Sequence, residues 1–463
     1  MIKILSAAAL LLCAPAAALA SGGHSPDISP IWIAPFALLL LCIAVLPLAA
    51  NHWWERNSSK ALVSGFFALI FSAYMLLAFG QAGGTSLLHA LLHEYLPFIV
   101  LLTALFVISG GIYIKGSLAG TPLSNSAFLV IGAVLASLIG TTGASMVLIR
   151  PLLRANRARE KKVHLVVFFI FVVSNCGGLL TPLGDPPLFL GFLKGVPFSW
   201  TLQLWKEWLT VNGLLIIIGN VVDQYMLSRE EKERKGSQLE AVLMHEPLGI
   251  VGWHNFFFLG GIVLVILGKG QGWGGEWPFG MQEILMTALT LAAYFTTKKE
   301  IRAANSFTFA PIIEVAVLFF GIFITMIAPL TVLNVHGKEL GLTDPWQFFW
   351  AAGALSSFLD NAPTYLTFAA TAAGSMGVSV ENQKYLAEFL ATGGAQAAEI
   401  LIAISCGAVF MGANTYIGNG PNFMVKAIAE ENGVKMPSFF GYMAWSCGLL
   451  LPLFVLVTLI FFW

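Results

Sequence analysis

Apolar stretches about as long as a membrane-spanning helix follow one another along this chain, and they constrain its fold more than any other feature. A helix needs about 20 mostly apolar residues to cross a bilayer. Charged residues make up 10% of the sequence, whereas soluble domains usually contain roughly 25%. The pattern predicts an all-α polytopic membrane protein whose surface faces the lipid bilayer. The predicted spans lie near residues 31–50, 61–80, 95–114, 163–193, 207–228, 248–268, 279–297, 310–335, 398–425 and 438–462.

Two further apolar stretches, 122–150 and 345–374, are interrupted by Gly, Pro and polar residues. We predict that each is a re-entrant hairpin, which enters and leaves the membrane on one side. Most Lys and Arg residues then lie in cytoplasmic loops, as the positive-inside rule requires, whereas a full crossing by either stretch would remove this bias. The Lys residues left outside are Lys194, Lys206, Lys269, Lys338 and Lys384.

Residues 1–20 have the composition of a cleavable signal peptide. Lys3 precedes a short apolar run, and Ala18-Leu19-Ala20 forms a small-residue cleavage site. A short uncleaved helix is the alternative. Cleavage would place the new amino terminus outside, and we expect a multi-pass protein of the bacterial cell inner membrane. A charged stretch opens a predicted cytoplasmic linker, 229–247, between the halves 31–228 and 248–463.

The two halves share an ordered sequence match. Thr181-Pro-Leu-Gly-Asp-Pro-Pro187 in the span 163–193 corresponds to Thr415-Tyr-Ile-Gly-Asn-Gly-Pro421 in the span 398–425, and each follows a predicted hairpin. Pro and Gly interrupt a helix, and peptide groups freed inside hydrocarbon must be buried in protein or line a cavity. We therefore predict two inverted-topology repeats, each with a hairpin and a discontinuous helix. Secondary transporters commonly have this design, with the binding site where the repeats meet.

Two acidic residues lie in the interrupted segments, one in a broken helix and one at a hairpin tip. Asp185 lies in the first broken helix and Asp360 at the tip of the second hairpin. A charge at the centre of a membrane helix costs about 2.5–3.5 kcal/mol on insertion scales, so such acids usually have a function. A carboxylate that binds either sodium or a proton would support exchange of the two. Asp185 could instead cap the half-helix that starts at Pro186.

Hydroxyl and amide groups gather at the same hairpin tips and breaks. Their oxygens suit a hard cation, although each could instead bond to neighbouring backbone. The predicted ion or substrate ligands, besides the two acids, are Thr141, Thr142, Ser145, Asn361, Thr415 and Asn419; Asn414 and Asn422 offer further amides.

Several other polar residues allow two interpretations. Glu314 is a candidate proton relay or an interfacial residue, and Arg150 could pair with an anionic substrate or extend to the membrane interface. His89 and His93 have the spacing of a metal pair or belong to an interfacial helix. The sequence contains no phosphate-binding loop and no nucleophile arrangement, so we expect neither an enzyme nor a cofactor. Its net charge of zero indicates no nucleic-acid partner.

The motifs resemble those of the ion transporter superfamily, which includes arsenite pump membrane subunits, dicarboxylate/sodium symporters, citrate transporters and related sodium:proton antiporters. The resemblance covers the chain from about residue 31 onward. It implies an elevator-type exchanger, often a homodimer, in which hairpins and broken helices move together. The ion site it implies comprises Thr142, Asp185, Asp360, Asn361, Thr415 and Asn419. The motifs that carry it are Thr141-Thr-Gly-Ala144, Ser174-Asn175 with Gly177-Gly178, Thr181-Pro-Leu-Gly-Asp185, Glu314 with Leu318-Phe-Phe-Gly321, and Ser357-Phe-Leu-Asp-Asn-Ala-Pro363.

One departure from the superfamily pattern bears on the substrate. The symporters carry Ser-Asn-Thr at both hairpin tips, whereas this chain has Gly140-Thr-Thr and Asp360-Asn-Ala. That favours the sodium:proton antiporter branch, with sodium at Asp185 and Asp360. The sequence thus predicts a sodium (or lithium)/proton antiporter. The alternatives are transport of citrate or another organic anion, and arsenite-type anion export.

Overall fold

The computed structural model describes residues 28–54, 56–117, 119–233, 246–275 and 277–463. Within them, seven helices are long and apolar enough to cross a membrane, or eight if a bent pair is counted as one span. This confirms the predicted all-α polytopic membrane fold. The predicted signal peptide 1–20 and residues 234–245 of the predicted linker lie outside the described residues.

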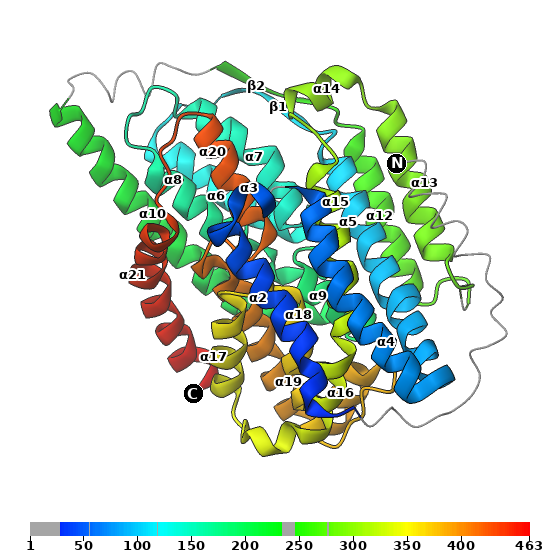
Figure 1. Cartoon of the computed structure of the whole chain (residues 1–463). Helices are drawn as coiled ribbons and strands as arrows, with labels where there is room; N and C mark the ends of the chain where they lie inside the picture. Colours follow the sequence, from blue (N-terminus) through cyan, green and yellow to red (C-terminus); the bar gives the residue numbers. More distant parts are fainter. Residues whose placement is uncertain (1–27, 55, 118, 234–245, 276) are drawn as a thin grey trace.

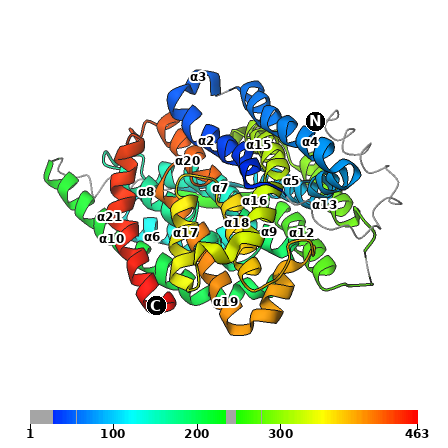
Figure 2. The same cartoon turned by 60° about the horizontal axis from the view of Figure 1, so that its bottom comes forward.

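One group of helices, the peripheral bundle, lies on one side of the molecule (Figure 1). Its members contact one another, and because they are apolar around most of their circumference, the outer ones can also face lipid. Figure 2 shows the same grouping from a second direction. The bundle comprises α4 (Asn57–His89), the π-helix η3 (Ala90–Tyr95), α5 (Leu96–Ser109), α12 (Asn255–Gly270), α13 (Met281–Thr296) and α15 (Ala310–Thr325). Beside it are η2 (Pro30–Ile33), α2 (Ala34–Ala49), α3 (Asn51–Trp54), α14 (Lys299–Ala304), α16 (Ile327–His336) and η6 (Gly337–Leu340).

A second group, the hairpin unit, contains both predicted hairpins and both broken helices. It comprises α6 (Pro122–Ile139), α7 (Thr141–Ala155), α8 (Val163–Val172), η4 (Cys176–Leu180), α9 (Pro186–Leu193), α17 (Pro345–Ser356), α18 (Asn361–Ser375), α19 (Tyr385–Met411), η7 (Gly412–Asn414) and α20 (Gly420–Glu431). Around it lie η5 (Phe198–Leu204), α10 (Trp205–Glu233), α21 (Phe439–Val457) and the π-helix η8 (Thr458–Phe462).

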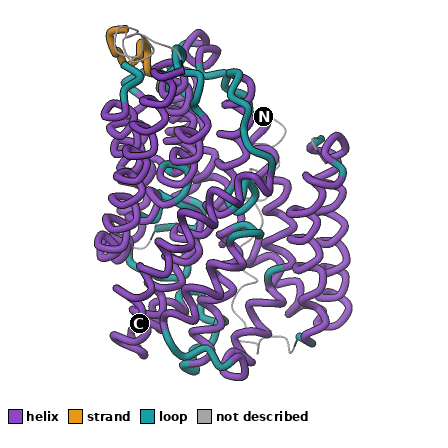
Figure 3. The backbone as a smooth tube through the Cα atoms, turned by 90° about the vertical axis from the view of Figure 1, so that its left-hand side faces the viewer, coloured by secondary structure: helices purple, strands orange, loops and turns teal. Residues whose placement is uncertain are grey.

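A two-stranded antiparallel sheet lies at one end of the molecule (Figure 3). Strand β1 (Tyr113–Ser117) follows α5, and β2 (Glu246–Val251) precedes α12, with Ile114 opposite Ile250. Asn305 also donates hydrogen bonds to the carbonyls of Gly110 and Ile112. This end of the molecule, called the sheet side below, therefore joins segments from both halves of the chain.

Both hairpins form helix pairs where the sequence predicts them. The chain turns between α6 and α7 at Gly140, whose φ of 82° lies in a region that other residues rarely adopt. Asp360 precedes α18, and its side chain accepts the amide of Ala362. By length and composition α6 could cross a membrane, so the re-entrant path stays a prediction.

The two broken helices share a local geometry. A 3-10 turn precedes each break, Thr181 and Thr415 are both extended, and so are Asp185 and Asn419 at the starts of α9 and α20. A Cβ on Gly184 would lie 2.0 Å from the Gly178 carbonyl oxygen, so the backbone passes itself too closely there for any side chain. The inverted orientation of the halves stays a prediction.

Some helix ends differ from those expected from sequence. Helix α4 continues to His89 through a kink at Gly80, and α19 begins at Tyr385 with a kink at Gly394. Helix α10 continues through residues 229–233 of the predicted linker. Pairing of Glu230 with Arg159 and of Glu233 with Lys161 holds this polar extension in helical form.

Candidate functional site

Asp185 is the residue at which both hairpin tips and both breaks meet. Its side chain is buried, with 1% of the residue exposed. One carboxylate oxygen accepts hydrogen bonds from Thr141 Oγ1 at 3.0 Å and Asn419 Nδ2 at 3.1 Å. The other accepts from Asn361 Nδ2 at 2.5 Å. Asp185 makes no side-chain cap bond to α9, so the alternative capping role is not the one observed.

The packing of the hairpin unit explains this convergence. Helix α7 of the first hairpin packs against α20, which follows the second break, and α18 of the second hairpin packs against α9, which follows the first. The amide of Thr141 also donates to the carbonyl of Gly184 at 2.8 Å. The tip of the first hairpin is therefore fixed beside the first break. Each hairpin also packs on the half-helix that follows the break of the other half.

A cavity of about 90 Å³ adjoins Asp185. A single water needs roughly 10–15 Å³, so the cavity has room for several waters or a hydrated ion. The site forms one wall, and apolar residues of the peripheral bundle form the other. The wall of the site comprises Ile139 to Gly143, Pro182 to Pro186, Phe189, Asp360 and Asn419 to Pro421; the bundle contributes Leu101, Leu102, Leu105, Phe106, Pro311, Ile312, Val315 and Phe319.

The electrostatics of this cavity favour positive charge. Among the described residues that line it, Asp185 and Asp360 are acidic and none is Lys, Arg or His. The three donors to Asp185 are neutral. Burying a charge without a partner of opposite charge is costly, and binding a cation or a proton would remove that cost.

Asn361 supplies a second oxygen suited to a cation. The residue is fully buried, and its Nδ2 donates to Asp185. Its Oδ1 is buried and has no hydrogen-bond partner within the described part of the chain. Buried polar atoms without a partner are rare in native structures and call for an explanation. A cation bound beside Asp185 would provide one.

The remaining predicted residues take different positions. Asp360 and Thr142 line the cavity. Ser145 bonds instead to Ser174, with 2.8 Å between the hydroxyl oxygens. Thr415 donates to the Ser357 carbonyl and accepts the amide of Gly418, which is the structural alternative considered above. Glu314 pairs with Lys60 at 2.7 Å and does not line the cavity.

Sequence reasoning missed the role of Asn175, a buried residue that links the two breaks. Its Nδ2 donates to Asn422 Oδ1 at 2.7 Å. Asn422 in turn donates to the carbonyls of Gly412 and Thr415, both at 2.9 Å. Amide side chains thus donate hydrogen bonds to carbonyls that the second break leaves without helical partners. The signal in the sequence that could have indicated this role is the presence of a polar residue, Asn175, inside an apolar span.

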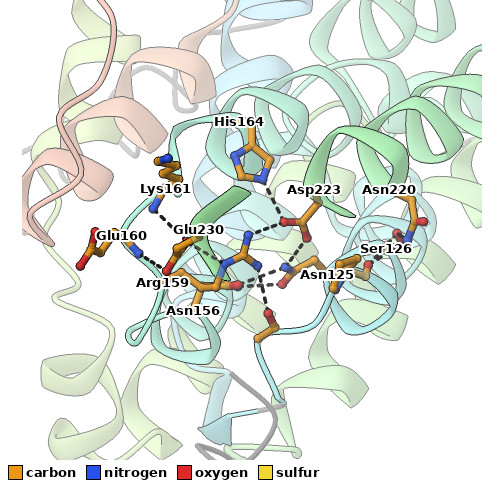
Figure 4. Close-up of polar contacts among 12 residues, drawn as sticks. Asn125, Ser126, Asn156, Arg159, Glu160, Lys161, His164, Asn220, Asp223 and Glu230 are labelled. Atoms are coloured by element: carbon orange, nitrogen blue, oxygen red, sulfur yellow. Dashed lines mark hydrogen bonds and ion pairs between the residues drawn. The ribbon is translucent and has the colours of Figure 1, made fainter. Parts of the chain in front are cut away.

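A second buried polar network lies near the sheet side, between α6, α8, α10 and the loop after α7 (Figure 4). Arg159 pairs with Asp223 at 2.8 Å and Glu230 at 3.4 Å. His164 Nε2 and Asn125 Nδ2 also contact Asp223, at 2.9 and 2.8 Å. The network joins the first hairpin to α10 and does not contact Asp185.

Comparison with known proteins adds an independent observation. A family model described as "Putative citrate transport" matches residues 25–462. No curated protein matches the chain. Because the match extends over almost the whole sequence, the protein belongs to this citrate-transporter-type family of multi-pass membrane transporters.

Proposed function

We propose that the protein is a secondary active transporter in which sodium (or lithium) and a proton bind alternately at Asp185, so that one is exchanged for the other. The observation that carries this proposal is a buried carboxylate with three neutral donors beside a cavity without lining Lys, Arg or His among the described residues.

Two states of the site follow from its chemistry. With sodium bound, the ligands would be oxygens of Asp185, Asn361 and Thr141, with Asp360 adding negative charge to the cavity. With a proton bound, the Asp185 carboxyl is neutral and its burial needs no counter-ion. Protonation of the carboxylate removes the charge that binds sodium, so binding of either ion excludes the other. The cavity lies between the hairpin unit and the peripheral bundle, where movement of one group past the other would change its access.

The test is a measurement of proton flux in everted vesicles or proteoliposomes. Sodium should collapse a preformed proton gradient with the wild-type protein, and neither Asp185→Asn nor Asp360→Asn should respond. Glu388→Gln is the control, because Glu388 is an exposed acid of the hairpin unit that does not line the cavity. A wild-type protein that does not respond to sodium, lithium or potassium between about pH 6 and 9 would exclude this function.

Citrate transport is the second candidate, and the family match favours it. Arg150, the residue offered by the sequence for binding an anion, does not line the cavity. A tricarboxylate would therefore need cations bound at Asp185 and Asp360 as its positive partners. Uptake of labelled citrate into proteoliposomes, with and without sodium, distinguishes the candidates, because cation exchange alone predicts no uptake.

A further inference from the structure

An ion pair connects the peripheral bundle to the helix that carries Asp185. Glu94 belongs to η3, and Lys194 is the C-cap residue of α9. Glu94 Oε1 and Lys194 Nζ are 2.6 Å apart, with side-chain exposures of 12% and 9%. His89 Nδ1 lies 3.5 Å from the same Glu94 oxygen. A charge pair this well shielded from solvent is screened far less than a surface pair.

Each partner is fixed within its own group of helices. Helix η3 packs on α4, α5 and α15, and the Tyr95 hydroxyl donates to the Ala316 carbonyl at 2.9 Å. On the other side, the Lys194 carbonyl accepts the amide of Leu386 in α19 at 3.1 Å. Helix α9 runs only from Pro186 to Leu193, so it connects Lys194 to the site within two or three turns.

The ion pair and the cavity lie at different heights along the same interface. The cavity is lined by Leu101, Leu102, Leu105 and Phe106 of α5, which follow Glu94 in the direction of β1. On α9 it is lined by Pro186 and Phe189, whereas Lys194 lies past the opposite end of that helix. The pair thus lies on the side of the cavity away from the β1–β2 sheet, called the far side here.

We propose that Glu94 and Lys194 form a gate that closes the site to the far side of the membrane and holds the state seen in this structure. If the hairpin unit moves relative to the peripheral bundle, a contact between these two fixed residues must break before the site can open to the far side. This inference rests on the alternating access of the proposed function, but not on the identity of the transported ion.

The chain offers a matched control pair. Lys60 and Glu314 are 2.7 Å apart, but they join α4 to α15 inside the peripheral bundle. Movement between the two groups of helices leaves this pair intact. Its neutralisation should therefore leave the access of the site unchanged.

Cysteine labelling tests the gate without knowledge of the substrate. Val315 lines the cavity from α15, so Val315→Cys is labelled with a membrane-impermeant maleimide in right-side-out and inside-out vesicles. Cys42 and Cys447, which are not fully buried, are first replaced by Ala. The ratio of sheet-side to far-side labelling of the parent is the reference. Glu94→Gln should shift the ratio of sheet-side to far-side labelling by about tenfold toward the far side, a typical size for coupling between two states.

Further variants decide the interpretation. The charge exchange Glu94→Lys with Lys194→Glu should restore the parental ratio, and Lys60→Gln should not change it. Equal ratios for Glu94→Gln and Lys60→Gln, in proteins with the same size-exclusion profile, would overturn the gate. If Glu94→Gln shifts the labelling ratio but the parent shows no sodium/proton exchange, the gate stands and the proposed ions are rejected.

A reversible cross-link provides a second test. In the double variant Glu94→Cys/Lys194→Cys, a bifunctional methanethiosulfonate is used to replace the length of the two side chains, because a direct disulfide needs Cα atoms within about 7 Å of each other. The cross-link should stop the flux of whichever substrate the parent transports, and a reductant should restore it. Undiminished flux through the cross-linked protein would overturn the proposal.

Discussion

Replacing Asp185 by Asn separates the role of its charge from the role of its shape. The two side chains are nearly the same size, and Asn can still accept the hydrogen bonds of Thr141 and Asn419 through its own Oδ1. Its amide nitrogen would then face Asn361 Nδ2, which is a donor in the wild type. The buried Oδ1 of Asn361 has no partner, so rotation of the Asn361 amide would supply the missing acceptor.

This geometry predicts a small change in stability and a large change in ion binding. The altered hydrogen bonds should change the free energy of unfolding by about 1 kcal/mol or less. A cation beside a carboxylate at about 4 Å gains roughly 4 kcal/mol at an effective dielectric constant of about 20. Because about 1.4 kcal/mol corresponds to a factor of ten, loss of the charge should weaken sodium binding about a thousandfold.

Two measurements on the purified protein check these magnitudes. Thermal unfolding without sodium should give similar midpoints for wild type and Asp185→Asn. Added sodium should raise the midpoint of the wild type alone, because a ligand stabilises the state that binds it. A variant that still gains stability from sodium within tenfold of the wild-type concentration range would refute the reasoning. A variant unfolded before sodium is added would refute the hydrogen-bond argument instead.

Three further predictions concern the structure around the site. Gly184→Ala should destabilise the folded protein by about 1–3 kcal/mol or prevent folding, because the new Cβ would lie 2.0 Å from the Gly178 carbonyl oxygen. The control is Gly213→Ala in α10, which has open space around it and should be neutral or stabilising in the same thermal unfolding assay. Gly140→Ala should cost about 1–3 kcal/mol, since φ is 82° and ψ is 149° there, a conformation that is essentially confined to Gly, and an unchanged unfolding midpoint would contradict the turn geometry. Arg159→Met should lower the free energy of unfolding by about 3–5 kcal/mol, because it leaves Asp223 and Glu230 buried without their guanidinium partner. Lys161→Gln removes the partly exposed pair with Glu233 and should lower the same free energy by less than about 1 kcal/mol.

Several features of the fold follow from local sequence and were predictable. Apolar runs of sufficient length form helices in a membrane because only a helix satisfies its own backbone there. Pro186 and Pro421 begin helices rather than continue them, because proline lacks an amide hydrogen and has a fixed φ. The predicted hairpin tips coincide with the turns at Gly140 and Asp360.

The partners of the polar residues were decided by tertiary packing. Thr141, Asn361 and Asn419 lie 44, 176 and 234 positions from Asp185 in the chain, and no local pattern specifies contacts at such separations. Ser145 and Thr415 have the same side-chain chemistry as Thr141, yet packing directs them to Ser174 and to backbone. Thus the sequence alone determined which segments are helical and where they break, because those properties depend on neighbouring residues. Which oxygens surround the buried carboxylate, and which ion pair joins the two groups of helices, depended on how distant segments pack.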